Sequence, residues 1–164
     1  MAVIDRLLIA CAAVACFAGA ADAADNASGT LPADVTRGRY LVQITGCNDC
    51  HTEGYAKSGG QVDEANWLLG DRLGWRGPWG TTYASNLRLA VKDMTAEQFV
   101  ARARSPLRPP MPWFNLVAMR DGDVKAIYAY LKHLGPAGEP APEYLPPDKV
   151  PTGPVISFPT PPKQ

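Results

Sequence analysis

Hydrophobic positions follow a helical period in two stretches of the chain. In residues 32–45, the apolar stripe consists of Val35, Leu41, Val42 and Ile44. In residues 121–134, a stronger stripe consists of Val124, Ile127, Tyr128, Leu131 and Leu134. Side chains three and four positions apart share one face of a helix. The pattern predicts a first helix that starts at Pro32 and a last helix that stops at Gly135, where glycine and proline end it.

A shorter helix is predicted between these two, from Thr95 to Arg104. Thr95 and Gln98 form a T-x-x-Q capping box, which marks the start of a helix. The following residues, 105–114, contain four prolines and are not expected to form a regular helix.

Two long stretches show no period. Residues 52–92 are rich in Gly, Trp and polar residues and predict mostly loop, with one helical turn at most. A loop of this length without regular structure is unusual in a compact domain unless something else, such as a bound group, holds it in place. Residues 136–164 contain ten prolines and predict an extended tail. The tail can lie along the domain or a partner through its apolar residues Tyr144, Leu145, Val155, Ile156 and Phe158.

Residues 1–23 have the order of a secretory signal peptide. Arg6 precedes an apolar run, and a small-residue segment follows with cleavage expected after Ala23 or Ala20. The run is shorter than the roughly 20 residues that a membrane span needs, although an uncleaved anchor is the alternative. The sequence therefore predicts a periplasmic protein with a flexible lead-in over residues 24–32 and no stable transmembrane segment.

Cleavage would also change the composition. It removes Cys11 and Cys16 and leaves Cys47 and Cys50. Loss of one basic and two acidic residues from 16 of each leaves 15 basic and 14 acidic residues. This balance gives no basic field for nucleic acid. The remaining length fits one small domain.

The two remaining cysteines belong to Cys47-Asn48-Asp49-Cys50-His51, the C-x-x-C-H pattern of covalent haem c attachment. Two thiols at this spacing can add to the two vinyl groups of the porphyrin, and the adjacent histidine can bind the iron. A redox-active dithiol would require a βαβ setting, and a zinc site would require a second cysteine pair. An ordinary disulfide would leave His51 without a role.

A second axial ligand is sought among Met94, Met111, Met119 and His133. Met94 has a packing role as a hydrophobic staple, Met119 can pack before the last helix, and His133 falls in an exposed last turn. Met111 is favoured because prolines on both sides restrict its backbone. A thioether ligand stabilises reduced iron and raises the potential. Met119, His133 or an open position are the alternatives.

The chain resembles the mono-haem class I cytochrome c superfamily, and more narrowly the cytochrome c domains in cytochrome subunits of periplasmic alcohol and sugar dehydrogenases. The similar segments, within residues 33–135, are GRYLVQITGCNDCHTEG, GPWGTTYASNLR and RPPMPWFNLVAMRDGDVKAIYAYLKHLG. The resemblance implies an all-α cytochrome c fold, with three or more helices around one covalent haem and a Pro-rich C-terminal tail.

The resemblance also assigns site residues. It makes His51 the proximal and Met111 the distal iron ligand, and brings Tyr83 and Asn86 near the haem propionates or the Met side of the ring. It suggests haem-pocket walls at Trp75, Trp79 and Trp113. It places Gly38, Tyr40, Tyr128 and Leu131 where the first and last helices cross.

The expected function is one-electron transfer between periplasmic redox proteins, such as a dehydrogenase or an oxidase, without catalysis on a substrate. The dehydrogenase subunits have three haem motifs and this chain has one, which favours a separate carrier. A fixed dehydrogenase subunit, docked through its tail, is the alternative. A haem enzyme such as a peroxidase is less favoured because it would require an open iron site.

Overall fold

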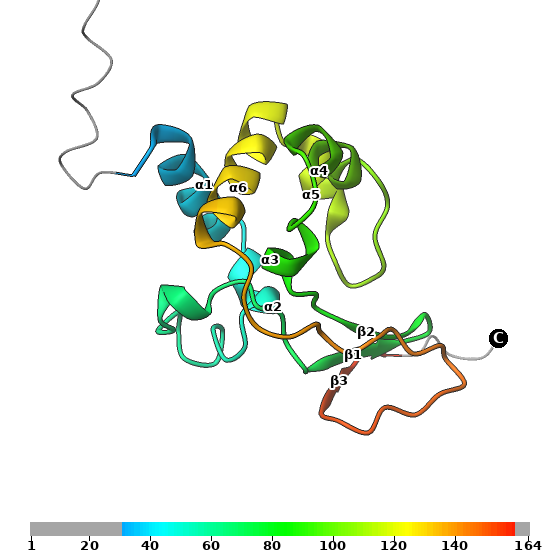
Figure 1. Ribbon diagram of the computed structural model, residues 1–164. Coiled ribbons are helices and arrows are strands. Elements are labelled where there is room, and N and C mark those ends of the chain that lie inside the picture. Colours follow the sequence, from blue (N-terminus) through cyan, green and yellow to red (C-terminus); the bar gives the residue numbers. More distant parts are fainter. Residues whose placement is uncertain (1–30, 160–164) are drawn as a thin grey trace, which may run out of the picture. The chain divides into compact units, whose positions relative to one another are not determined.

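The computed structural model describes residues 31–159 (Figure 1). The predicted signal peptide, most of the lead-in and the last five residues lie outside the described residues. The elements are α1 (Ala33–Ile44), α2 (Cys47–His51), the 3-10 helix η1 (Glu64–Asn66), β1 (Gly74–Gly77), β2 (Gly80–Tyr83), α3 (Leu87–Ala90), α4 (Ala96–Ala103), α5 (Trp113–Ala118), α6 (Asp121–Leu134) and β3 (Val155–Ser157). Within this described range, no helix is both long and apolar enough to cross a membrane.

The first and last helices, α1 and α6, cross in direct contact, as the family resemblance implies. Gly38 makes the crossing possible, because a Cβ there would lie only 2.0 Å from the carbonyl oxygen of Ala126 and 2.8 Å from the Cβ of Tyr130. The buried core around this contact includes Val35, Leu41, Val42, Trp67, Leu68, Ile127, Tyr130 and Leu131. Tyr40, expected at the crossing, is instead 51% exposed. The close approach of backbones at Gly38 thus fixes how α1 meets α6.

The capping box at the start of α4 is confirmed. The Gln98 backbone N–H donates to Thr95 Oγ1 at 3.2 Å, and the Thr95 backbone N–H donates to Gln98 Oε1 at 2.8 Å. Helix α5 was not predicted, and it begins directly after Pro112, inside the stretch expected to be irregular. Proline is tolerated at a helix start because its missing N–H would have no helical partner there.

The expectation of an all-α fold is wrong, because the described residues include a three-stranded sheet in the order β2-β1-β3. Strands β1 and β2 pair antiparallel, with Gly74 opposite Tyr83, and β3 pairs parallel to β1, with Gly74 opposite Val155. Glycine is disfavoured in strands, and three of the eight residues in β1 and β2 are glycines, so local sequence gave no strand pattern. The third strand comes from the proline-rich tail.

The tail follows the sheet on both sides of the β1–β2 hairpin. Leu145 exchanges two backbone hydrogen bonds with Thr81 of β2, at 2.8 and 3.0 Å, and β3 lies along β1. Phe158 packs between Trp75 and Trp79, with ring centroids 6.1 and 5.2 Å away. Figure 1 shows this segment running below the helices and returning to the strands. The apolar residues of the tail therefore contact the chain's own sheet.

Candidate functional site

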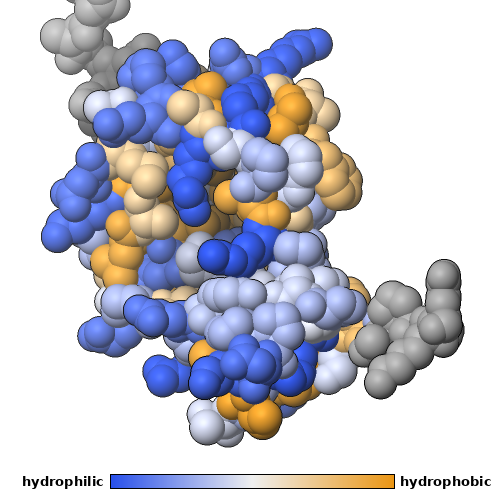
Figure 2. Space-filling model, turned by 90° about the vertical axis from the view of Figure 1, so that its right-hand side faces the viewer, coloured by the Kyte–Doolittle hydropathy of each residue, from blue (hydrophilic) through white to orange (hydrophobic). Residues whose placement is uncertain are grey.

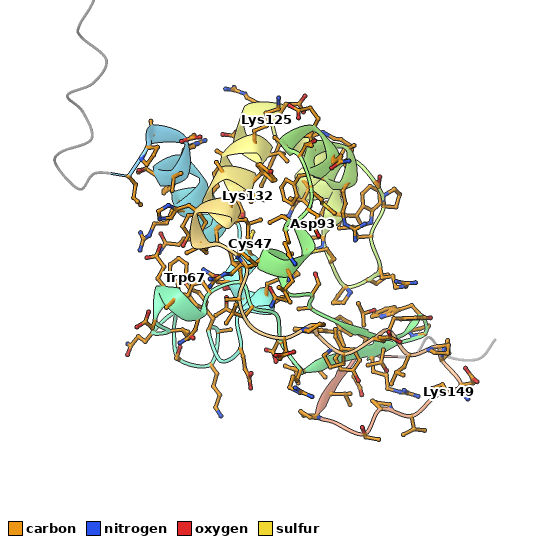
Figure 3. The ribbon with its side chains drawn as sticks, viewed as in Figure 1. Cys47, Trp67, Asp93, Lys125, Lys132 and Lys149 are labelled. Carbon is orange, nitrogen blue, oxygen red and sulfur yellow. The ribbon has the colours of Figure 1, made fainter. Side chains whose placement is uncertain are left out.

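The C-x-x-C-H residues form the short helix α2, directly after the chain turns at the end of α1. Gly46 makes this turn with a φ of +72°, and Cys47–His51 is one helical turn. Cys47 and Cys50 are free thiols and half-buried. Figure 3 shows Cys47 near the centre of the molecule, below the end of α6. Both sulfurs remain available for covalent attachment of a group.

His51 is buried, with 8% of its surface exposed, and its ring orientation is fixed by one hydrogen bond. Its Nδ1 lies 2.7 Å from the backbone oxygen of Ser85, so Nδ1–H donates and Nε2 keeps its lone pair. Burial lowers the pKa of His51, which favours the neutral imidazole. A histidine that binds a metal typically donates its other N–H to a carbonyl or carboxylate in this way.

Gly70 brings Ser85 close to His51. The Gly70 N–H donates to the His51 carbonyl oxygen at 2.8 Å. A Cβ on Gly70 would lie 2.8 Å from the Asn86 nitrogen and 2.9 Å from the Ala84 oxygen, and its φ is +87°. Only glycine allows the segment around Ser85 to approach this closely. Sequence reasoning missed both residues, because nothing in their spacing links them to the histidine.

A buried polar network holds α2 from inside. Thr52 Oγ1 donates to Asn48 Oδ1 at 2.7 Å and accepts from the Leu68 N–H at 2.8 Å. The Asn48 Nδ2 is buried without a hydrogen-bond partner among the described residues. The same helical turn thus contains two thiols, an imidazole whose Nε2 is free, and a buried donor without a partner among the described residues. Together these groups fit a covalently attached haem.

Met111 belongs to the loop between α4 and α5. Figure 1 shows this loop on the far side of α3 from α1. It is half-buried, and its N–H donates to the Arg108 oxygen at 3.2 Å. Met119 packs against the core, and the Met94 oxygen accepts from the Tyr128 hydroxyl at 2.7 Å. His133 is exposed. The side chain of Met119 thus has a packing role of its own, whereas the contact of Met94 involves only its backbone oxygen.

The other predicted site residues lie on the hairpin and around α3. Asn86 is the N-cap of α3, and its side chain donates to the Ala137 and Glu139 oxygens, which ties the tail to the site region. Tyr83 ends β2 and is half-buried. Trp79 has a buried Nε1 without a partner among the described residues, as does the Thr82 hydroxyl.

Trp75 and Trp79 share contacts with Phe158, whereas Trp113 begins α5 and contacts Phe114. Figure 2 shows hydrophobic and hydrophilic residues intermixed on the face that it displays. An open cavity of about 400 Å³ adjoins this region, between residues around Gly70 and residues 138–141 of the tail. None of the predicted site residues lines it.

Comparison with known proteins finds one matching family and several relatives. The cytochrome c family profile matches residues 35–135. The chain is 28% identical over 112 residues to the cytochrome c subunit of a quinone alcohol dehydrogenase from Gluconobacter oxydans, covering 60% of this chain and 21% of that one. It is 28% identical over 121 residues to the cytochrome subunit of a Gluconobacter japonicus fructose dehydrogenase, and the alignment covers 66% of this chain and 23% of that one.

A third relative is the cytochrome c subunit of a gluconate 2-dehydrogenase from Pantoea cypripedii, 31% identical over 128 residues, which cover 71% of this chain and 26% of that one. The chain spans about a quarter of the length of these relatives. No solved structure matches the chain. The family match covers more than half of the sequence and includes every residue of the C-x-x-C-H motif. The chain belongs to the cytochrome c family, and its cofactor is covalently bound haem c with its iron.

Proposed function

We propose that the protein is a periplasmic electron carrier with one haem c, whose iron is held by His51 and Met111. The observation that carries this proposal is the 2.7 Å contact between His51 Nδ1 and the Ser85 oxygen. It leaves Nε2 as the nitrogen that can bind iron, in a neutral and buried ring.

The chain's own residues have distinct roles in this function. Cys47 and Cys50 hold the cofactor by two thioether bonds, so it is not lost between partners. Ser85 fixes the histidine ring and raises its basicity toward the metal. When bound, the haem supplies a one-electron couple between ferric and ferrous iron. The thioether of Met111 favours the ferrous state and raises the potential.

Replacing Met111 tests the ligand set. In the haem-loaded Met111→Ala protein, the weak near-infrared band of sulfur-to-iron charge transfer should disappear and the reduction potential should fall. Met119→Leu is the matched control, because Met119 packs against the core, and it should keep the band. An unchanged band in Met111→Ala would rule out Met111 as the ligand.

Electron transfer without catalysis predicts that both axial positions are filled. Cyanide or peroxide should therefore leave the spectrum of the reduced wild-type protein unchanged. Rapid binding of either would favour a haem enzyme such as a peroxidase.

Export is the second part of the proposal, and it rests on the charged, apolar and small-residue order of residues 1–23. The mature protein should have the mass of residues 24–164 plus one haem. A mass that retains residues 1–23 would contradict cleavage, and a mass without haem would contradict covalent attachment.

A fixed subunit of a dehydrogenase is the second candidate. It is favoured by the three relatives, which are cytochrome subunits of an alcohol, a fructose and a gluconate dehydrogenase. Gel filtration of the full chain with a sugar or alcohol dehydrogenase distinguishes a fixed subunit from a free electron carrier. A stable complex supports the subunit, whereas electron transfer without a complex supports the free carrier.

A further inference from the structure

The loop that contains Met111 is closed at its base by Arg104. This guanidinium donates to the Leu116 oxygen, to the Met119 oxygen at 2.9 Å and to Asp121 Oδ1 at 2.5 Å. The last residue before the loop is thereby joined to the end of α5. The base is fixed, and the position of Met111 depends on what holds the rest of the loop.

The opposite part of the loop contacts the tail. The Arg108 guanidinium carbon lies 4.3 Å from the centre of the Tyr144 ring, within the range of a cation–π interaction. The oxygen of Arg108 also accepts the hydrogen bond from the Met111 N–H, at 3.2 Å. A shift of Arg108 would therefore move the backbone of Met111.

Tyr144 is itself held firmly by the sheet. Its hydroxyl donates to the Trp79 oxygen at 2.8 Å, and the neighbouring Leu145 pairs with Thr81 through two backbone hydrogen bonds. Further along the tail, Arg76 of β1 donates to the Lys149 oxygen at 2.8 Å. The ring thus offers Arg108 a fixed surface that belongs to the sheet.

We propose that Tyr144 is a positioning residue for the axial methionine: through its contact with Arg108, the C-terminal tail holds the Met111 loop in the conformation that ligates iron. This inference rests on the proposed ligation by Met111. Loss of the contact lets the loop move away more often, so an external ligand such as imidazole competes more easily for the ferric iron.

The expected effect is modest. An exposed cation–π contact corresponds to about a two- to fivefold change in an equilibrium constant. In the haem-loaded full-length protein, Tyr144→Leu and Arg108→Gln should each raise the affinity of the ferric form for imidazole by about this factor, and weaken the near-infrared band on warming.

Two variants give the controls. Tyr144→Phe keeps the aromatic face and should retain most of the wild-type resistance to imidazole. Arg102→Gln removes an exposed arginine from α4 that has no aromatic or ionic contact in the described part of the chain, and should change nothing. The double variant Arg108→Gln/Tyr144→Leu should match either single variant, because both remove one contact.

Unchanged imidazole affinity in Arg108→Gln, or effects that add fully in the double variant, would overturn the proposal. Arg108 is exposed in a loop, so its replacement tests the contact even if Tyr144→Leu fails to fold. If Met111→Ala keeps the near-infrared band, the ligand assignment itself fails. If Met111→Ala loses the band while Arg108→Gln behaves as wild type, only the positioning role fails.

Discussion

The Tyr130 hydroxyl donates a 2.7 Å hydrogen bond to Glu64 Oε1 and thereby joins α6 to η1. The same carboxylate accepts from Arg39 of α1, through Nε at 2.9 Å and Nη2 at 2.8 Å. Arg39 also lies over the ring of Trp67, 5.3 Å from its centre. One carboxylate therefore connects both crossing helices to the segment that follows the haem motif. Figure 3 shows Trp67 at η1, in the same segment.

This connection predicts a pH dependence of stability. The hydrogen bond from Arg39 holds the pKa of Glu64 below its ordinary value, with a further contribution from Tyr130. A carboxyl with a lowered folded pKa stabilises the protein above its unfolded pKa, and that stability is lost as pH falls through the folded value.

The free energy of unfolding should therefore fall as pH drops below about 4.3, the ordinary Glu value. In Glu64→Gln this part of the decline should be missing and stability at neutral pH should be lower by about 1 kcal/mol, because the pair is partly exposed to solvent. Urea unfolding of the wild-type and Glu64→Gln proteins between pH 7 and pH 3 measures both the acid-dependent decline and the difference in stability at neutral pH. Parallel curves for the two proteins would contradict the role of Glu64.

Gly70→Ala should disturb the histidine site. The added Cβ would meet the backbone of Ala84 and Asn86 below 3.0 Å and push the Ser85 carbonyl away from His51. We expect a loss of about 1–3 kcal/mol of stability, and a changed His51 Nδ1–H chemical shift and reduction potential. Gly59→Ala is the control, since Gly59 has a similar backbone, with a φ of +65°, and no neighbour within 4 Å. Equal potentials in the two variants would argue against the contact.

Arg88 should matter for stability although no carboxylate pairs with it in the described residues. It is buried and donates to the Gly135 and Leu134 oxygens, both at 2.6 Å, and to the Ala65 oxygen at 2.8 Å. Its positive charge also sits favourably at the C-terminal end of α6. Arg88→Leu should cost about 1–3 kcal/mol, because three carbonyls in partly buried hydrogen bonds lose their donor.

Arg88→Lys should recover little of this loss, since one ammonium group cannot replace the planar guanidinium across three carbonyls. Urea unfolding at neutral pH compares the three proteins. Wild-type stability in the lysine variant would indicate that charge alone is sufficient.

Removal of the last strand should destabilise the domain. A chain that ends at Gly153 lacks β3 and Phe158, which exposes the edge of β1 and removes the partner of Trp75 and Trp79. We expect a lower melting temperature and tryptophan fluorescence at longer wavelength. Phe158→Leu keeps the strand and should give a smaller change. A truncated protein as stable as the full chain would show that the tail is free for another partner.

The sequence predicted the parts of the fold that local signals determine. The stripes of α1 and α6 and the capping box at Thr95 are contained in the residues that form them. The strands were missed because β1 and β2 are short and glycine-rich, and because β3 pairs with residues far away in the chain. Helix α5 was hidden by the four prolines before it.

The residues of the candidate site likewise divide into those that a local sequence motif predicts and those that only the fold brings together. Cys47, Cys50 and His51 form a motif that can be read directly, whereas the partner of His51 is a backbone oxygen. Any residue at position 85 would offer the same carbonyl group, so composition gives no sign of it. Arg108 and Tyr144 likewise meet only because the tail returns to the sheet.

The parallel pairing of β3 with β1 also has a consequence for how the protein forms. Gly74 and Val155 are opposite each other, so this ladder closes a loop of some 80 residues, whereas the β1–β2 hairpin closes one of a few residues. Long-range pairings form slowly because loop closure must come first. The hairpin can therefore form while the chain is still emerging, but the sheet is completed only after residues 155–157 have also emerged.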